Sequence, residues 1–299
     1  MTHLIGVLHG QEETFPAALI AELNSRPGCH AEPVTAGGVE RPAYRVLIDR
    51  LSPRVPYFAS YVRSAAGAGC QVLNDPFWAL AQDRSTLGFA GSVPTVLLPS
   101  HSHPEGVSSE DLSSLLYPLP WQDYLDVVGL PAVLRPARLG ARGGTVVNSL
   151  RELWDAYGCT GRELMVLQSQ LTPDHHLMVL VAGEVAFGLG YDPSVGEYRV
   201  QAELERGPAV AAIEAARAFC ARTGCALAGL EFALCGGRPV MTDLHLVPDL
   251  DWWSISEKAF TRVVGATADL ALERANTKGG RPPAKHFSSA RTPVRKRSN

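Results

Sequence analysis

The order in which strand and helix patterns follow one another most constrains how this chain can fold. Over the first 80 residues, short apolar runs alternate with amphipathic stretches. The strand candidates are His3–His9, Val46–Ile48 and Gln71–Leu73, and the helix candidates are Thr14–Ser25 and Tyr57–Ala66. Strands that alternate with helices need crossover connections, which favour parallel pairing. The first part of the chain is therefore predicted to be a parallel βαβ lobe.

The second part of the chain carries a different pattern, in which strands follow one another across short turns. The strand candidates are Val133–Arg135, Thr145–Val147, Leu164–Gln168, Leu177–Ala182, Val185–Leu189, Ala226–Leu234 and Pro239–Leu246, and the helix candidates are Leu150–Tyr157, Pro208–Thr223 and Glu257–Glu273. Tight turns join antiparallel neighbours. The chain is thus predicted to be α/β (α+β), with antiparallel sheets and flanking helices after a boundary between residues 84 and 100.

Lysine is nearly absent from the chain, and this excludes one class of nucleotide site. The four lysines are Lys258, Lys278, Lys285 and Lys296, so residues 1–257 contain none. A Walker A phosphate loop requires a lysine after its last glycine. Arginine must therefore hold any phosphate group that the body of the chain binds.

Two neighbouring strand candidates carry acidic and imidazole groups in otherwise apolar sequence. Asp243 and His245 lie two apart on one strand and therefore point to the same side, while Glu231 lies on the strand before it. Two carboxylates at close range repel each other unless a cation or proton lies between them. Oxygen ligands of this kind suit Mg²⁺. The alternative is a solvated sheet face without a metal.

A glycine-rich turn between two strand candidates is bordered by arginines. Arg135, Arg138 and Arg142 surround it, and Gly143 and Gly144 close it. Glycine lets backbone N–H groups approach an anion closely, and arginine can bind phosphate through two hydrogen bonds. The turn is therefore either an anion-binding loop or an ordinary hairpin connection.

These segments, in this order, resemble the ATP-grasp proteins, a group that includes carboxylate–amine ligases. The resemblance extends roughly from Asp49 to Asp251. It implies that residues 1–83 precede an ATP-grasp domain of residues 84–274, and that residues 275–299 form a tail. It also implies a ligase that joins a carboxylate to an amine through an acyl phosphate, with ATP and Mg²⁺. The substrate would be a small-molecule or peptide carboxylate.

The resemblance also assigns roles to individual residues. Glu231, Asp243 and His245 stand at the family's metal ligands, and Arg199 stands where a catalytic arginine is common. The remaining matches are to nucleotide-binding positions: Arg84 and Arg135 at the two lysine positions, Arg138, Arg142, Gly143 and Gly144 in the lid loop, and Gln168, Ser169 and Gln170 in the hinge.

The chain departs from the family pattern at four of these positions, one of which is Ser169, where an acidic hinge residue is common. Both lysines are replaced by arginine, whose planar guanidinium is not interchangeable with an ammonium group. His245 replaces the usual asparagine, and its nitrogen weakens Mg²⁺ binding or favours Mn²⁺. The alternative function is therefore a degenerate ATP-grasp module that binds a nucleotide or a partner without turnover.

Charge and hydropathy complete the set of expectations. The chain carries a formal charge of −3, but residues 275–299 contain seven Lys/Arg and no Asp/Glu, so the rest carries −10. An acidic body argues against nucleic-acid binding, except through the basic tail, which is predicted to be disordered.

No apolar stretch is long enough to span a membrane, and the start reads as a strand rather than a signal peptide. A cytoplasmic location is expected, and the sequence does not determine the oligomeric state.

Overall fold

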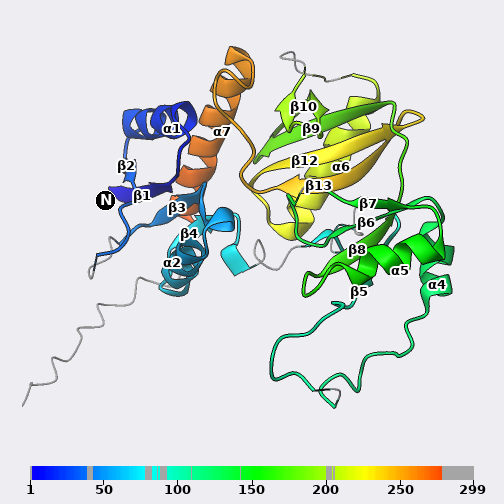
Figure 1. Ribbon diagram of the computed structural model, residues 1–299. Helices are drawn as coiled ribbons and strands as arrows, with labels where there is room; N and C mark the ends of the chain where they lie inside the picture. The colour runs from blue at the N-terminus through cyan, green and yellow to red at the C-terminus, as the bar shows by residue number, and fades with distance from the viewer. Residues whose placement is uncertain are drawn as a thin grey trace, which may run out of the picture.

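A computed structural model describes residues 2–38, 43–77, 83–85, 87, 93–108, 110–141, 143–199, 204 and 206–277. Its N-terminal lobe contains a four-stranded parallel sheet in the order β2-β1-β3-β4 (Figure 1). The strands are β1 (His3–Leu8), β2 (Cys29–Pro33), β3 (Val46–Asp49) and β4 (Gln71–Leu73), and the helices are α1 (Thr14–Ser25), η1 (Ser52–Arg54) and α2 (Pro56–Gly67). The predicted parallel lobe is confirmed.

A small antiparallel sheet follows, in the order β5-β8-β6-β7. It consists of β5 (Thr95–Leu98), β6 (Ala132–Pro136), β7 (Thr145–Val147) and β8 (Met165–Ser169), with helices α4 (Trp121–Val128) and α5 (Leu150–Gly158). Ser149 caps α5 by accepting a hydrogen bond from the Glu152 N–H at 3.2 Å. Side chains of both helices pack with this sheet into a separate core around Leu134, Leu153 and Leu167.

The large antiparallel sheet has five strands in the order β11-β10-β9-β12-β13. Its strands are β9 (His175–Ala182), β10 (Val185–Asp192), β11 (Glu197–Tyr198), β12 (Leu227–Cys235) and β13 (Arg238–His245). Helix α6 (Pro208–Thr223) covers one face and ends at Gly224, whose φ of 71° suits a residue without a Cβ. Mixed α/β architecture with antiparallel sheets and flanking helices is thus confirmed as predicted.

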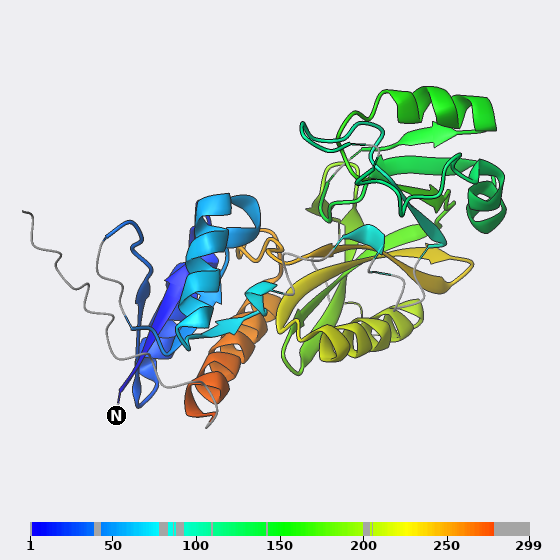
Figure 2. The same cartoon turned by 90° about the horizontal axis from the view of Figure 1, so that it is seen from below.

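Helix α7 (Glu257–Asn276) joins the parallel lobe to the large sheet. It lies between them in both orientations (Figures 1 and 2). One core contains Ile5 and Val46 of the parallel sheet, Met178 and Leu180 of β9, and Ala268 of α7. The helix continues two residues beyond the expected start of the tail at residue 275, and the rest of the tail, from residue 278, lies outside the described residues. Among the described helices, none is both long and apolar enough to cross a membrane.

Two buried polar residues fasten the parallel lobe to the large sheet. The Asn74 side chain accepts hydrogen bonds from the N–H groups of Ala226 and Leu227, at 2.8 and 3.0 Å, and donates to the Leu227 carbonyl at 2.6 Å. Arg50 is 1% exposed and pairs with Glu12 and with the Pro248 carbonyl. The Asn74 contacts fix the start of β12, which carries Glu231, and the Arg50 contact fixes the segment after β13.

Candidate active site

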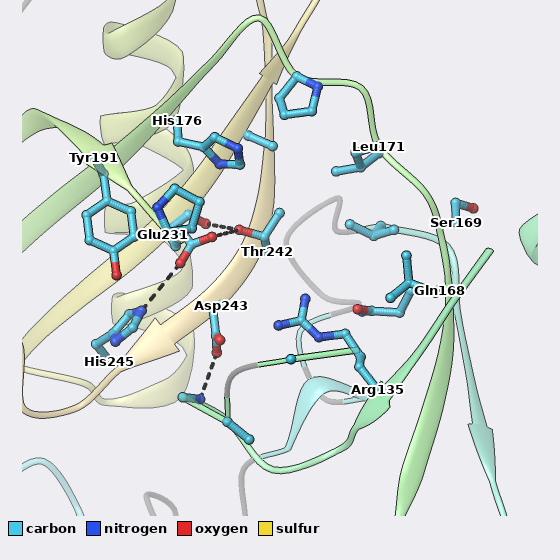
Figure 3. Close-up of a pocket in the computed structure, with 18 residues that line it drawn as sticks. Arg135, Gln168, Ser169, Leu171, His176, Tyr191, Glu231, Thr242, Asp243 and His245 are labelled. Atoms are coloured by element: carbon cyan, nitrogen blue, oxygen red, sulfur yellow. Dashed lines mark hydrogen bonds and ion pairs between the residues drawn. The ribbon is translucent and has the colours of Figure 1, made fainter. Parts of the chain in front are cut away.

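A cavity of about 300 Å³ opens between the large and small sheets. Its size falls at the lower end of the range for small-molecule sites. Residues of β9, β10, β12 and β13 form one wall, and residues of β6, β8 and the loop after β6 form the other (Figure 3). One face of the large sheet has two neighbours. It packs on α7 near Leu180, and further along the strands the same face lines the cavity, where the small sheet covers it.

The structure brings together the three predicted metal ligands. Glu231 and Asp243 are direct cross-strand partners, and His245 lies two residues further on the same face. One potential ligand atom from each lies within 4.8 Å of the other two. A register shift beside Glu231 forms a β-bulge, because Phe232 pairs with Met241 and leaves Thr242 unpaired. The bulge turns Thr242 as well as Asp243 toward the cavity, as bulges at functional sites often do.

Glu231 is held in place and kept ionised by its neighbours. Its Oε1 accepts a hydrogen bond from the Thr242 hydroxyl at 2.9 Å, and its Oε2 lies 3.6 Å from Nε2 of His245. Burial opposes ionisation, but His245 and Thr242 outweigh it and hold the pKa of the Glu231 carboxyl below its usual value. Glu231 is therefore a carboxylate facing the cavity (Figure 3).

Asp243 has a different environment, because its carboxylate is already paired. Oδ2 accepts from Nη2 of Arg84 at 2.6 Å, and Oδ1 accepts from the N–H groups of Leu244 and Gly140 at 2.9 and 3.1 Å. Arg84 is completely buried and also donates to the carbonyls of Pro136, Arg138 and Ala141. Arg84 therefore lies behind the cavity wall and fastens the glycine-rich loop to the large sheet.

Arg135, at the other predicted lysine position, lines the cavity itself. Its side chain extends from β6 toward Asp243 (Figure 3). Desolvation and the nearby Arg84 lower the pKa of Arg135, which is consistent with a cation partly removed from water. Its Nε is buried without a hydrogen-bond partner among the described residues. An unpaired buried donor facing a cavity is costly, and an anionic ligand would satisfy it.

The glycine-rich loop borders the cavity only in part. Gly140, Ala141 and Gly143 line it, whereas Arg138 is exposed elsewhere and Arg142 lies outside the described residues. Gly144 packs closely on the small sheet, since a Cβ there would lie 2.8 Å from the Val133 side chain. Glycine at this position is thus required by packing.

Two of the three predicted hinge residues reach the cavity. Gln168 and Ser169 line it, while the Gln170 side chain is exposed outside it. The Gln168 side chain donates to the Thr95 hydroxyl at 2.9 Å, and the Ser169 hydroxyl donates to the Val128 carbonyl at 2.6 Å. The N–H groups of Ser169 and Gln170 bond to the carbonyls of Pro94 and Pro131.

Arg199, the predicted catalytic residue, lies apart from this cluster. It pairs with Asp192 through a side chain that is 67% exposed. It lines a second hollow, of about 470 Å³, which shares His176, Tyr191 and Pro193 with the first. The structure therefore does not bring Arg199 into contact with Glu231, Asp243 or His245.

Three residues that line the cavity were not assigned to a site from the sequence. His176 presents a buried Nδ1 without a hydrogen-bond partner among the described residues, and its neighbour His175 faces the other side. The Tyr191 ring lies edge-on to His245, with centroids 6.2 Å apart. Strand alternation allows one of the two adjacent histidines on each face but does not say which. Thr242 could not be found by alternation, because the bulge reverses its side.

Comparison with known proteins finds similarity in structure. No protein-family model and no curated protein sequence matches the chain. A RimK domain protein of the ATP-grasp type from Sphaerobacter thermophilus superposes with a TM-score of 0.61 at 16% identity, over 90% of this chain and 99% of that one. D-alanine–D-alanine ligase from Bacillus anthracis, complexed with ATP, gives 0.59 at 13% identity, over 92% and 97%. D-cycloserine synthetase superposes with a TM-score of 0.61 at 14% sequence identity, over 90% of this chain and 99% of the synthetase. At such identities the likeness concerns the fold.

Proposed function

Because the chain has the ATP-grasp fold, we propose that it is an ATP-dependent ligase that joins a carboxylate to an amine or similar nucleophile through an acyl phosphate. The observation that carries this proposal is the cavity, where ionised Glu231 and the nearby Nε2 of His245 lie across from Arg135, whose Nε has no hydrogen-bond partner in the described part of the chain. A metal–triphosphate needs acidic groups that hold the metal and cationic groups that contact the phosphates. Structural neighbours named as a ligase and as a synthetase support the reaction class.

The residues present fit a divalent metal and a nucleotide. Glu231 and His245 would hold Mg²⁺ or Mn²⁺, and Arg135 with the N–H groups of the glycine-rich loop would contact the phosphates. Bound ATP would supply the phosphoryl group that activates the carboxylate. Gln168 and Ser169, at the far end of the cavity, would position the base. Arg84 would act indirectly, by holding the loop in place.

The chain's own residues would contribute positioning and charge neutralisation. The fixed cation of Arg135 needs no reorganisation as negative charge develops nearby, and a partly buried site strengthens that interaction. Helix α7 packs on one end of the large sheet's inner face, and the small sheet borders the cavity at the other end. Orientation and preformed charge are the main protein contributions to phosphoryl transfer.

Calorimetric titration of the full chain with ATP and Mn²⁺ or Mg²⁺ tests the proposal. We expect saturable binding, at least tenfold weaker in Arg135→Met. Arg138→Met is the matched control, because Arg138 is exposed outside the cavity, and it should bind ATP as the wild type does. No nucleotide binding with either metal would refute the proposal. Release of ADP that depends on both a carboxylate and an amine would then establish the reaction class.

One observation favours a second candidate, a module that binds nucleotide without turnover. The Arg84 guanidinium donates to three carbonyls and to Asp243, so it is not directed at the cavity. Two variants, Arg135→Lys and His245→Asn, discriminate the candidates. ATP hydrolysis that appears only in the variants favours the binding module, whereas turnover by the wild-type chain excludes it.

A further inference from the structure

We propose that the Arg84 guanidinium takes the place of a cation at Asp243, so that the site binds one divalent ion, at Glu231 and His245, and prefers a transition metal to Mg²⁺. This inference rests on the proposed function for the presence of a metal. It differs from the sequence expectation, in which Asp243 is itself a metal ligand.

Asp243 has little capacity left for a metal. A carboxylate can accept about four hydrogen bonds, and three are already made to Asp243, by Arg84, Gly140 and Leu244. Asp243 is 5% exposed and Arg84 is not exposed at all. An ion that took more than the one remaining acceptor position of Asp243 would have to displace a buried guanidinium and leave that charge unpaired, which is strongly unfavourable.

Arg84 is also fixed from the opposite side. Its Nη1 donates to the Pro136 carbonyl at 2.7 Å and to the Arg138 carbonyl, and its Nη2 donates to the Ala141 carbonyl at 2.7 Å. If Arg84 moved, these carbonyls would lose a hydrogen-bond donor, and Asp243 would lose its ion-pair partner. The pair therefore belongs to the frame that holds the glycine-rich loop against β13.

Glu231 and His245, by contrast, have donor atoms to spare. Thr242 occupies Oε1 of Glu231, which leaves Oε2 at 3.6 Å from Nε2 of His245. That nitrogen is buried and has no hydrogen-bond partner among the residues described. Two ligands each about 2.1 Å from one tetrahedral ion lie about 3.4 Å apart. The observed spacing is thus suited to one ion between the two atoms.

The chemistry of this pair determines which ion it favours. Mg²⁺ prefers oxygen ligands and near-ideal octahedral geometry. Imidazole suits later first-row ions such as Co²⁺ and Zn²⁺, which gain most from His245, whereas Mn²⁺, the first ion of the Irving–Williams order, gains less and Mg²⁺ gains least. The Asp243 charge, neutralised by Arg84, adds little attraction for a second ion.

Titration of the full chain with Mn²⁺ alone, followed by electron paramagnetic resonance of the free ion, tests the inference. We expect one Mn²⁺ per chain. Glu231→Gln and His245→Ala should each weaken Mn²⁺ binding at least tenfold. Asp243→Asn should change the dissociation constant less than threefold, while it lowers the melting temperature. His175→Ala is the control, because His175 is exposed on the opposite face of β9, and it should bind Mn²⁺ normally.

Several outcomes would overturn the inference: no Mn²⁺ binding to the wild type, two ions per chain, or a tenfold loss in Asp243→Asn with unchanged melting temperature. If Asp243→Asn does not fold, pulsed resonance on wild-type protein decides instead. Nitrogen coupling from His245 should be present, and should disappear in His245→Asn, where Mg²⁺ should compete better with Mn²⁺. Absence of nitrogen coupling in the wild-type protein would contradict the inference that His245 binds the ion. Because no nucleotide is added, failure of ATP binding would refute the proposed ligase and leave this metal result standing.

Discussion

At the scale of single residues, Asp251 shows how a distant side chain can complete a helix. Helix α1 begins after Glu13, which makes no side-chain capping bond. Instead, Oδ1 of Asp251 accepts from the N–H groups of Thr14 and Phe15, at 2.9 and 3.2 Å, and from the Thr14 hydroxyl at 2.6 Å. Asp251→Ala should therefore destabilise the protein by about 1–2 kcal/mol. Urea unfolding measures this, with Glu13→Ala as a control that should have little effect.

The same interaction predicts a pH dependence. Burial would raise the pKa of Asp251, but hydrogen bonds from Thr14 and Phe15 outweigh it and lower the pKa below its usual value. A depressed folded-state pKa contributes stability above the unfolded value of about 3.9, and this contribution is lost as the pH falls through the folded-state pKa. The stability gap between wild type and Asp251→Ala should thus be constant near neutrality and narrow below about pH 4. A gap that widens there would contradict this explanation.

Gly144 gives a second prediction at the scale of residues. A Cβ at this position would lie 2.8 Å from Cγ1 of Val133 and 3.2 Å from Cβ of Arg135. Gly144→Ala should displace Arg135 and lower the free energy of unfolding by about 1–3 kcal/mol through overpacking. It should also weaken ATP binding. Thermal unfolding and calorimetry measure the two effects. Gly158→Ala, where a Cβ meets no atom of the described residues within 4 Å, should change neither the melting temperature nor ATP binding.

At the scale of elements, α7 depends on small side chains along its buried face. Ala268 and Ala271 are completely buried between the parallel lobe and the large sheet. Ala268→Leu should force the helix away from its neighbours and lower stability by about 1–3 kcal/mol. Glu273→Leu, on the exposed side of the same helix, should have little effect. Equal melting temperatures for the two variants would show that α7 packs loosely.

Elements with strong periodicity could be predicted from the sequence, and those fixed by tertiary contacts could not. Helices α1 and α6 begin and end as predicted, because their apolar spacing and the stop at Gly224 are local signals. Strand β2 was missed because it lies at the sheet edge and only Ala31 of its five residues is buried. The convergence of Glu231, Asp243 and His245 followed from strand alternation. The bulge at Thr242 and the Arg84–Asp243 pair did not, since they depend on segments that meet only in the folded protein.

At the scale of the whole molecule, the packing divides the chain differently from its sequence order. The C-terminal helix shares one core with the N-terminal lobe and the large sheet, while the small sheet has a core of its own. Arg84 is a polar link between the two parts, because it bonds both to Asp243 and to carbonyls at the end of β6 and in the loop after it. The parallel lobe and the large sheet are therefore expected to unfold together, and the small sheet can open separately.

This division gives a prediction for Arg84→Met, which keeps apolar volume but removes the ion pair and its hydrogen bonds. Because Asp243 would be left without its partner, the free energy of unfolding should fall by about 3–5 kcal/mol. The loss should mainly weaken the attachment of the small sheet. Hydrogen exchange monitored by mass spectrometry should then become faster in β6, β7 and the loop between them, and stay unchanged in β1 and β3. The physical reason is that small-sheet opening needs no disruption of the core around α7. Acceleration spread evenly over all three sheets would instead mean that the chain opens as a single unit, and that Arg84 stabilises the whole of it.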